Sequence, residues 1–180
     1  FNWAKDKKLI NQFGFTSHGS TSLITDAIGS KKFDFCSLHL HLFDQSKISL
    51  AKFALQMGMG VIAISPADKG GHLHSPSLAL IQDCHPISPL RLAYRFLLSQ
   101  GISTLTIGAS SRKDFTLVKK LINKGGALTP SEKASINNLA QAGKYRLDDT
   151  FCGQCRQCLP CPQNIPIPEL LRLRNLAIGH

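Results

Sequence analysis

The stretch Gly60-Val61-Ile62-Ala63-Ile64-Ser65 is apolar along nearly its whole length and is as long as one β-strand. A continuous apolar run of this kind is typical of a strand in a parallel sheet that is covered on both faces. Further apolar runs indicate three more strands, at residues 13–17, 33–39 and 103–108. Segments with the helical spacing of apolar residues accompany them, at residues 20–28, at 50–57, from Ser88-Pro89 onward, and at 112–122.

This alternation of strands and helices predicts an α/β fold with parallel strands joined by right-handed crossovers. Four such units form either a small open sheet or half of a (β/α)8 barrel, and periodicity does not choose between the two. Residues 66–87, rich in Gly, His, Ser and Pro, are predicted to form one long loop after the third strand. Loops of that length are commonly functional.

The C-terminal part of the chain differs from the β/α units. Thr129-Pro130-Ser131-Glu132 matches a capping box and predicts a helix that runs to about residue 142. Gly125-Gly126 before it marks a boundary. We therefore expect two domains, residues 1–125 with the β/α units and residues 126–180 with a small helical tail that carries a cysteine cluster.

Four cysteines lie within ten residues of that tail: Cys152, Cys155, Cys158 and Cys161. Cysteine thiolates hold iron–sulfur clusters, and the bacterial signature is C-x2-C-x2-C-x3-C-P. The pattern here ends in a two-residue gap followed by Pro162, so it departs from the signature in its last spacing. Prolines keep the segment out of a regular helix, which leaves a loop that can wrap a metal cluster. We expect these four thiolates to hold a 4Fe-4S cluster.

Three other interpretations of the cysteines remain open. A tetrathiolate zinc site usually separates two Cys-x2-Cys pairs by a dozen or more residues, and the gap between Cys155 and Cys158 leaves no room for that. A disulfide framework needs an oxidising compartment, and nothing in the sequence indicates export. Buried free thiols clustered by chance would not be expected to have regular spacing. Cys36 and Cys84 lie far away and are expected to be ordinary free thiols.

The composition limits the function classes. The chain has 180 residues, 43% of them hydrophobic, which is enough for a packed core. Its 21 Lys and Arg exceed its 11 Asp and Glu, a net charge of +10, but they are scattered, and no nucleic-acid-binding motif accompanies them. No apolar run reaches the ~18 residues that a membrane span needs. We expect a cytoplasmic protein that binds neither nucleic acid nor a membrane, with positive charge available to an anionic ligand.

Short motifs follow one another along the chain. They are Gly14-Phe-Thr-Ser17-His18-Gly19-Ser20, Lys32-Phe-Asp-Phe-Cys-Ser-Leu-His39, Met57-Gly-Met-Gly-Val-Ile-Ala-Ile-Ser65-Pro66-Ala-Asp-Lys69-Gly70-Gly71, Ser88-Pro89-Leu-Arg-Leu-Ala-Tyr-Arg-Phe-Leu-Leu, Ile107-Gly108-Ala109-Ser110 and the cysteine tail. In this order they resemble the C-terminal half of the aldo/keto reductases, in the branch with a C-terminal ferredoxin-like 4Fe-4S segment. The resemblance covers nearly the whole chain. It implies that the four strands are the fifth to eighth of a (β/α)8 TIM barrel.

The resemblance also implies a site for a nicotinamide cofactor such as NADP at the carboxyl ends of these strands. The implied residues are Ser17 at the carboxamide of the nicotinamide, Ser37 at the polar position of the sixth strand where the family often has Gln, Ser65, Pro66, Ala67 and Lys69 at the diphosphate, and Gly108, Ser110 and Arg112 at the 2′-phosphate. Small residues let backbone N–H groups approach an anion, and a helix N-terminus with an Arg favours a phosphate. The alternative is that Ser110 is a plain helix N-cap and Arg112 a solvated charge. Ile64 and Val118 stand where the family commonly has a stacking aromatic residue and a carboxamide or acid.

The catalytic Asp, Tyr, Lys and His of the family lie in the first four strands, so no catalytic residue is assigned in this chain. The resemblance therefore implies a fragment, inactive alone, of an oxidoreductase that acts on a carbonyl or alcohol substrate. The start at Phe1 without Met and the end at His180 favour truncation. The cluster would either exchange electrons with a redox protein partner or only hold the tail together. The alternative function is a non-catalytic iron–sulfur electron carrier or docking module on a barrel scaffold.

Overall fold

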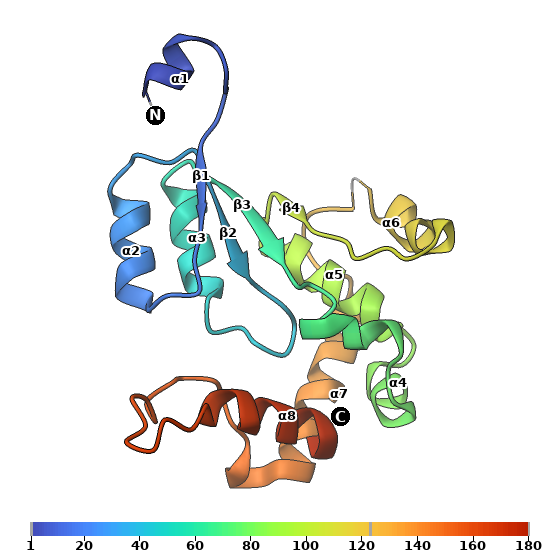
Figure 1. Ribbon diagram of the computed structural model, residues 1–180. Helices are drawn as coiled ribbons and strands as arrows, with labels where there is room; N and C mark the ends of the chain where they lie inside the picture. The colour runs from blue at the N-terminus through green and yellow to red at the C-terminus, as the bar shows by residue number, and fades with distance from the viewer. Residues whose placement is uncertain (1, 123, 180) are drawn as a thin grey trace. The chain divides into compact units, whose positions relative to one another are not determined.

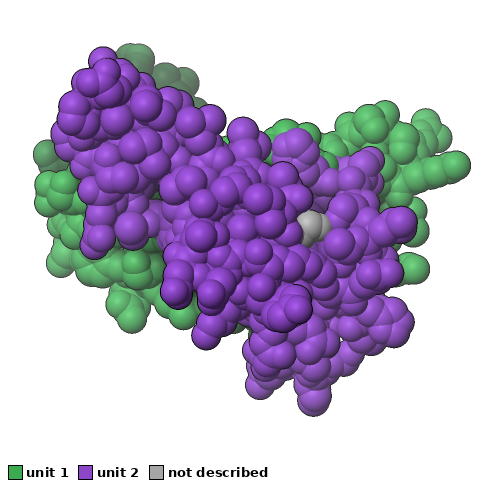
Figure 2. Space-filling view, turned by 90° about the horizontal axis from the view of Figure 1, so that it is seen from below, with its two compact units in different colours: residues 1–71, 93–126 green, residues 72–92, 127–180 purple. Residues whose placement is uncertain are grey.

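The computed structural model of the chain describes residues 2–122 and 124–179 (Figure 1). The chain divides into two compact units, which Figure 2 shows in two colours. Unit 1 comprises residues 1–71 and 93–126, and unit 2 comprises residues 72–92 and 127–180. The expected domain boundary after residue 125 lies beside the division at residue 126, but residues 72–92 group with the C-terminal segment. The domains 1–125 and 126–180 stay a prediction, and the two chain ends on which truncation was inferred lie outside the described residues.

Unit 1 contains a four-stranded parallel sheet with the strand order β1-β2-β3-β4. The strands are β1 (Gly14–Thr16), β2 (Phe35–His39), β3 (Gly60–Ile64) and β4 (Thr104–Leu105). Strands that follow one another in the chain are neighbours in the sheet, which confirms the predicted α/β fold of parallel strands with helices. β4 is shorter than the strand predicted over residues 103–108. Within the described residues, only β3 pairs with it.

The two faces of the sheet differ in burial. Side chains of a strand alternate between the faces, and one face carries the fully buried Cys36, Leu38, Val61 and Ala63. The helix α3 (Ile48–Gln56) packs against β2 and β3, and α2 (Thr21–Gly29) packs against α3. Figure 1 shows both helices on the same side of the sheet. On the other face Ile62 and Ile64 are half-buried, so the expectation that β3 is covered on both faces is wrong for these two residues.

Local chemistry explains where α2 begins and which side it buries. The Ser20 hydroxyl accepts a hydrogen bond from the Leu23 N–H at 3.3 Å, which caps the helix at the residue before Thr21. Ile24 and Ile28, one helical turn apart, are fully buried. In α3 the buried residues are Leu50, Ala51 and Ala54. The ends of both helices lie within two residues of their predicted positions at 20–28 and 50–57.

The first 126 residues also include the helical segments α1 (Asn2–Asp6), α5 (Pro89–Ser99), η2 (Arg112–Asp114) and α6 (Phe115–Leu121). The Ser88-Pro89 signal predicts the start of α5 correctly. The predicted helix over residues 112–122 is correct in place but consists of the short 3-10 turn η2 followed by α6. The carboxylate of Asp114 explains this division, because it binds the backbone at the start of η2.

Unit 2 contains α4 (Leu78–Cys84), α7 (Pro130–Leu147), η3 (Asp148–Thr150) and α8 (Ile167–Gly179), and η1 (Lys69–His74) ends in it. The capping box is confirmed, since the Thr129 hydroxyl accepts from the Glu132 N–H and the Glu132 carboxylate accepts from the Thr129 N–H. The prediction of one long loop over residues 66–87 is wrong, because α4 forms inside it. The Ser77 hydroxyl caps α4 by accepting from the Leu80 N–H at 3.0 Å.

No helix within residues 2–122 and 124–179 combines the length and the apolar character that a bilayer-spanning helix needs.

Candidate functional site

Two histidines meet where β1 and β2 end. His39 is the last residue of β2, and His18 follows β1. Their rings lie with centroids 4.7 Å apart and planes tilted by 50°. In β/α barrels the ligand lies at the carboxyl ends of the strands, so this imidazole pair is at the end of the sheet where a site is expected.

The environment of His39 favours its neutral form. Burial is the main factor that lowers the pKa of His39 to about 4, and nearby positive groups, first His18 and then Lys69, lower it further. Its Nδ1 is buried and has no hydrogen-bond partner among the described residues. At neutral pH the ring is therefore an uncharged hydrogen-bonding group at the edge of the sheet.

A buried contact between a histidine and a carboxylate joins the loops that follow β2 and β3. The Nδ1 of His41 lies 3.6 Å from the Oδ1 of Asp68, and the two side chains are 1% and 0% exposed. Oδ1 of Asp68 also accepts a hydrogen bond from the Lys69 N–H at 2.7 Å. Asp68 is not among the predicted site residues, because no local pattern links two residues from different β/α units.

The loop over residues 65–71 has an unusual backbone. Ser65 and Asp68 have φ values of 57° and 64°, and Gly70 and Gly71 have φ values of 78° and 74°. Left-handed conformations are unfavourable for residues with a Cβ. The predicted diphosphate residues Ser65, Pro66, Ala67 and Lys69 all lie in this loop, directly after β3. Pro66 and Ala67 are buried, while Ser65 and Lys69 are half-buried.

The predicted cofactor residues Ser17 and Ser37 belong to neighbouring β/α units, Ser37 within β2 and Ser17 directly after β1. Ser37 is half-buried in β2, on the same face as His39, and is in register with Thr16 and Ile62. Ser17 follows β1, and its hydroxyl oxygen accepts a hydrogen bond from the Gly19 N–H at 3.0 Å. That bond leaves the hydroxyl hydrogen of Ser17 available as a donor.

After β4, a carboxylate of the chain itself binds the groups that were predicted to receive a phosphate. Oδ2 of Asp114 accepts from the N–H groups of Ser110 at 2.9 Å and Ser111 at 2.8 Å, and their hydroxyls each lie 3.3 Å from it. These hydrogen bonds, of which the one from the Ser111 N–H has the largest effect, hold the pKa of Asp114 below its ordinary value. Gly108 and Arg112 are exposed beside them. The Ser-x-x-Asp spacing of Ser111 and Asp114 is a capping-box signal that could have revealed this role.

The cysteine segment is a loop whose beginning is bound to α8. Residues 151–166 contain no helix or strand, and Gln154, Arg156 and Asn164 have left-handed φ values. Asn175 binds the backbone of Cys152 on both sides, accepting from its N–H at 3.3 Å and donating to its C=O at 2.8 Å. The buried Gln154, 4% exposed, donates to the C=O of Pro168 at 2.9 Å and lies 3.5 Å from the sulfur of Cys152.

The four sulfurs do not form a closed site in this conformation. Cys155 and Cys158 are exposed, and Cys152 and Cys161 are half-buried. Across residues 2–122 and 124–179, no three His, Cys, Asp or Glu side chains are grouped so that they could hold a metal ion. The donor set fits an iron–sulfur cluster in its chemistry, but the loop would have to close around it.

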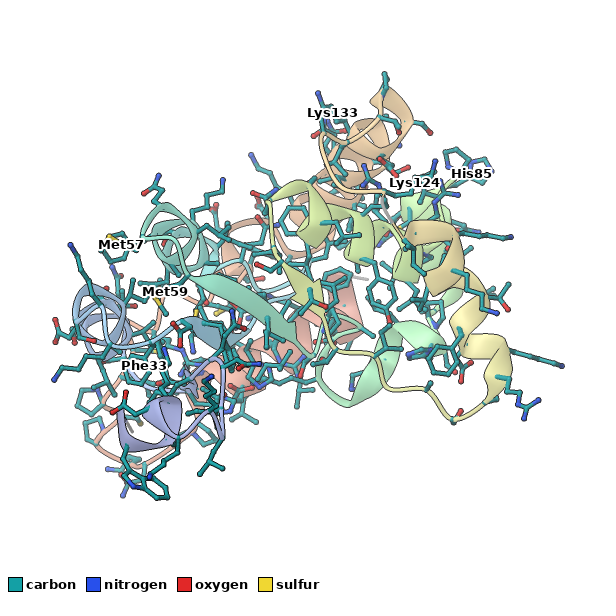
Figure 3. All side chains as sticks on the ribbon, turned by 90° about the horizontal axis from the view of Figure 1, so that it is seen from above. Phe33, Met57, Met59, His85, Lys124 and Lys133 are labelled. Carbon is teal, nitrogen blue, oxygen red and sulfur yellow. The ribbon has the colours of Figure 1, made fainter. Side chains whose placement is uncertain are left out.

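A cavity of about 250 Å³ lies at the other end of the sheet. Gln12, Asp34 and Met59, which precede β1, β2 and β3, line it together with residues from the ends of α2 and α3. Figure 3 labels Phe33, Met57 and Met59 in this lining. No residue of the predicted site lines this cavity.

Comparison with known proteins reveals similarity to two solved structures of one enzyme. No protein-family model and no curated protein matches the chain. The aldo-keto reductase AKR11C1 from Bacillus halodurans, in its holo form, matches with a TM-score of 0.60 and 19% identity over 76% of this chain and 52% of that chain. Its apo form matches with the same TM-score and identity, over 53% of its length. The chain spans about half the length of these neighbours and has the fold of part of a (β/α)8 barrel.

Proposed function

We propose that this chain is part of an aldo/keto-reductase-like oxidoreductase, which transfers a hydride between a nicotinamide cofactor and a carbonyl or alcohol substrate. The observation that carries the proposal is the parallel β/α sheet, which has the fold of part of an aldo-keto reductase. Polar residues at the carboxyl ends of its strands support a ligand there. Because the chain spans about half of the solved neighbours, the activity is proposed for a complete barrel. These residues alone are proposed to be inactive.

The proposed cofactor is NADP, which supplies the hydride when it is bound. Ser17 and Ser37 would orient the carboxamide of the nicotinamide through their hydroxyl groups. The loop from Ser65 to Ala67, with Lys69, would bind the diphosphate through backbone N–H groups and positive charge. The free hydroxyl hydrogen of Ser17 and the half-buried position of Ser37 fit these roles.

At the end of β4 the position of Asp114 changes the proposed contacts. The N–H groups of Ser110 and Ser111 already bind this carboxylate, so they are not available to a second anion. The exposed guanidinium of Arg112 is the group of the predicted set that would attract a 2′-phosphate. We assign the main phosphate contact to Arg112, with Gly108 and Ser110 only shaping the loop.

The proposed cluster ligands are Cys152, Cys155, Cys158 and Cys161. Closing their loop around a 4Fe-4S cluster would break no helix or strand, since residues 151–166 contain neither. When bound, such a cluster supplies one-electron transfer, with a redox protein as the source or acceptor of electrons. The thiol donor set and its spacing support this assignment.

A second candidate is a non-catalytic iron–sulfur carrier or docking module. Two observations favour it. Asp114 occupies the backbone donors after β4, and Ile64 provides no aromatic ring at the end of β3. In this case the barrel fold would be a scaffold, and the cysteine segment would be the functional part.

The experiment that tests the proposal combines two measurements on the anaerobically purified chain. Iron and acid-labile sulfide are quantified, and the binding of NADPH and NADH is measured by isothermal titration calorimetry. The proposal expects iron, sulfide and NADPH binding, with Arg112→Ala weakening NADPH more than NADH. Iron without binding of either nucleotide would support the module instead. Absence of both would refute the two candidates.

A further inference from the structure

His41 and Asp68 form a buried pair that the proposed reaction does not use. Placing a carboxylate and an imidazole in a nearly water-free environment is costly unless each is compensated. Here the two side chains are 1% and 0% exposed, and Nδ1 of His41 lies 3.6 Å from Oδ1 of Asp68. The pair connects the loop after β2 with the loop after β3, beside the hydrogen bond from the Leu40 N–H to the Ile64 C=O.

Asp68 also shapes its own loop. Its Oδ1 accepts from the Lys69 N–H at 2.7 Å, and its C=O accepts from the Gly71 N–H at 3.0 Å. Its backbone is left-handed, with φ at 64°, a conformation that Asp adopts where its short side chain bonds to the local backbone. The bond to the Lys69 N–H and the contact with His41 hold Asp68 in this conformation.

We propose that Asp68 and His41 are positioning residues that hold the loop over residues 65–71 in the shape that binds the diphosphate of a dinucleotide. This inference rests on the proposed function for its ligand. The pair itself touches no reacting atom. It acts by holding the loop in one shape before the ligand arrives, which reduces the entropy cost of binding. The N–H groups of Lys69 and Gly71 are bound to Asp68 and are not counted among the diphosphate donors.

Three substitutions test the role of the pair. Asp68→Asn keeps the shape but replaces the carboxylate by a weaker, neutral acceptor for the Lys69 N–H and removes the charge that faces His41. His41→Leu removes the imidazole nitrogen, whereas His41→Asn keeps an N–H donor close to the place of Nδ1. Asp83→Asn is the control, because it breaks a carboxylate–guanidinium pair with Arg146 in unit 2.

The first readout is amide hydrogen exchange in the absence of ligand. We expect the amides of Lys69 and Gly71 to exchange about tenfold faster or more in Asp68→Asn and His41→Leu, and at nearly the original rate in His41→Asn and Asp83→Asn. The amide of Thr106, which donates to the Ala63 C=O, should be unchanged in all four. Unchanged exchange at Lys69 and Gly71 in both disruptive variants would overturn the inference. If one disruptive variant does not fold, the other decides.

The second readout is the affinity for NADPH by calorimetry. The dissociation constant should rise about tenfold in the two disruptive variants and return close to its original value in His41→Asn, a recovery that a loss of general stability would not produce. Faster exchange with unchanged affinity would overturn the positioning role. If the unsubstituted chain does not bind NADPH, both the proposed cofactor and the assignment of this loop as its diphosphate site are refuted. The exchange data then still report whether His41 and Asp68 order the loop.

Discussion

Replacing Asn175 tests how the cysteine loop is attached to α8. Asn175 is 8% exposed, and its amide group forms two hydrogen bonds with the backbone of Cys152. Asn175→Leu keeps the branched shape of the side chain but forms neither bond. At about 1 kcal/mol for each bond, and with the N–H and C=O of the half-buried Cys152 left to water, we expect a loss of about 2 kcal/mol in the free energy of unfolding.

The assay is urea unfolding followed by far-UV circular dichroism. Leu173→Ala is the matched control, because Leu173 is on the same helix and 49% exposed. Its change should stay within about 0.5 kcal/mol. Alkylation of Cys152 by a thiol reagent should also be faster in Asn175→Leu, because the loop is no longer held. A denaturation midpoint and an alkylation rate equal to those of the control would show that the two hydrogen bonds do not hold the loop.

Three further predictions concern unit 1 and the start of α7. The pKa of His39 is lowered to about 4 from 6.5. Between these two pH values the unfolded chain therefore binds more protons than the folded chain. The free energy of unfolding should fall as the pH decreases from about 6.5 to about 4, and it should not depend on this group above that range. His39→Asn should remove this part of the pH profile, and an unaltered profile would contradict the assigned pKa. Gly14→Ala should destabilise the sheet by about 1–3 kcal/mol in thermal or urea unfolding, because the added Cβ would overlap the ring of Phe35. Gly108→Ala is the control, since a Cβ added there has no heavy atom within 4 Å. Equal stability of the two variants would refute the clash. Thr129→Ala should cost about 1 kcal/mol through loss of the α7 cap, whereas Thr129→Ser should retain it, and equal losses would argue against the hydroxyl as the cap.

Most of the secondary structure could be predicted from the chain because its signals are local. Apolar runs predict β1 to β3, and the caps of α2 and α7 lie within three residues of the bonds that they make. The error over residues 66–87 has a local cause as well. The Gly- and Pro-rich composition concealed the Ser77 cap and the buried Leu80 and Cys84 of α4.

The candidate site was only partly predictable. Ser65 to Lys69 could be named because they follow an apolar strand, and parallel strands place such residues at one edge of a sheet. Asp114 was missed, although its spacing from Ser111 is a capping signal. The four cysteines are evident in the sequence, but the sequence does not show whether their sulfurs converge, and in this conformation they do not form a closed site.

The order of apolar and polar residues was sufficient to determine the parallel β/α sheet, since each strand and helix depends on neighbours a few positions away. The tertiary structure alone decided which polar side chains meet. His41 and Asp68 belong to successive β/α units, and Asn175 lies 23 residues from Cys152. Such pairs form only when the chain folds, because the entropy cost of bringing distant residues together is offset by the packing of the whole core. No local sequence pattern therefore marks these pairs.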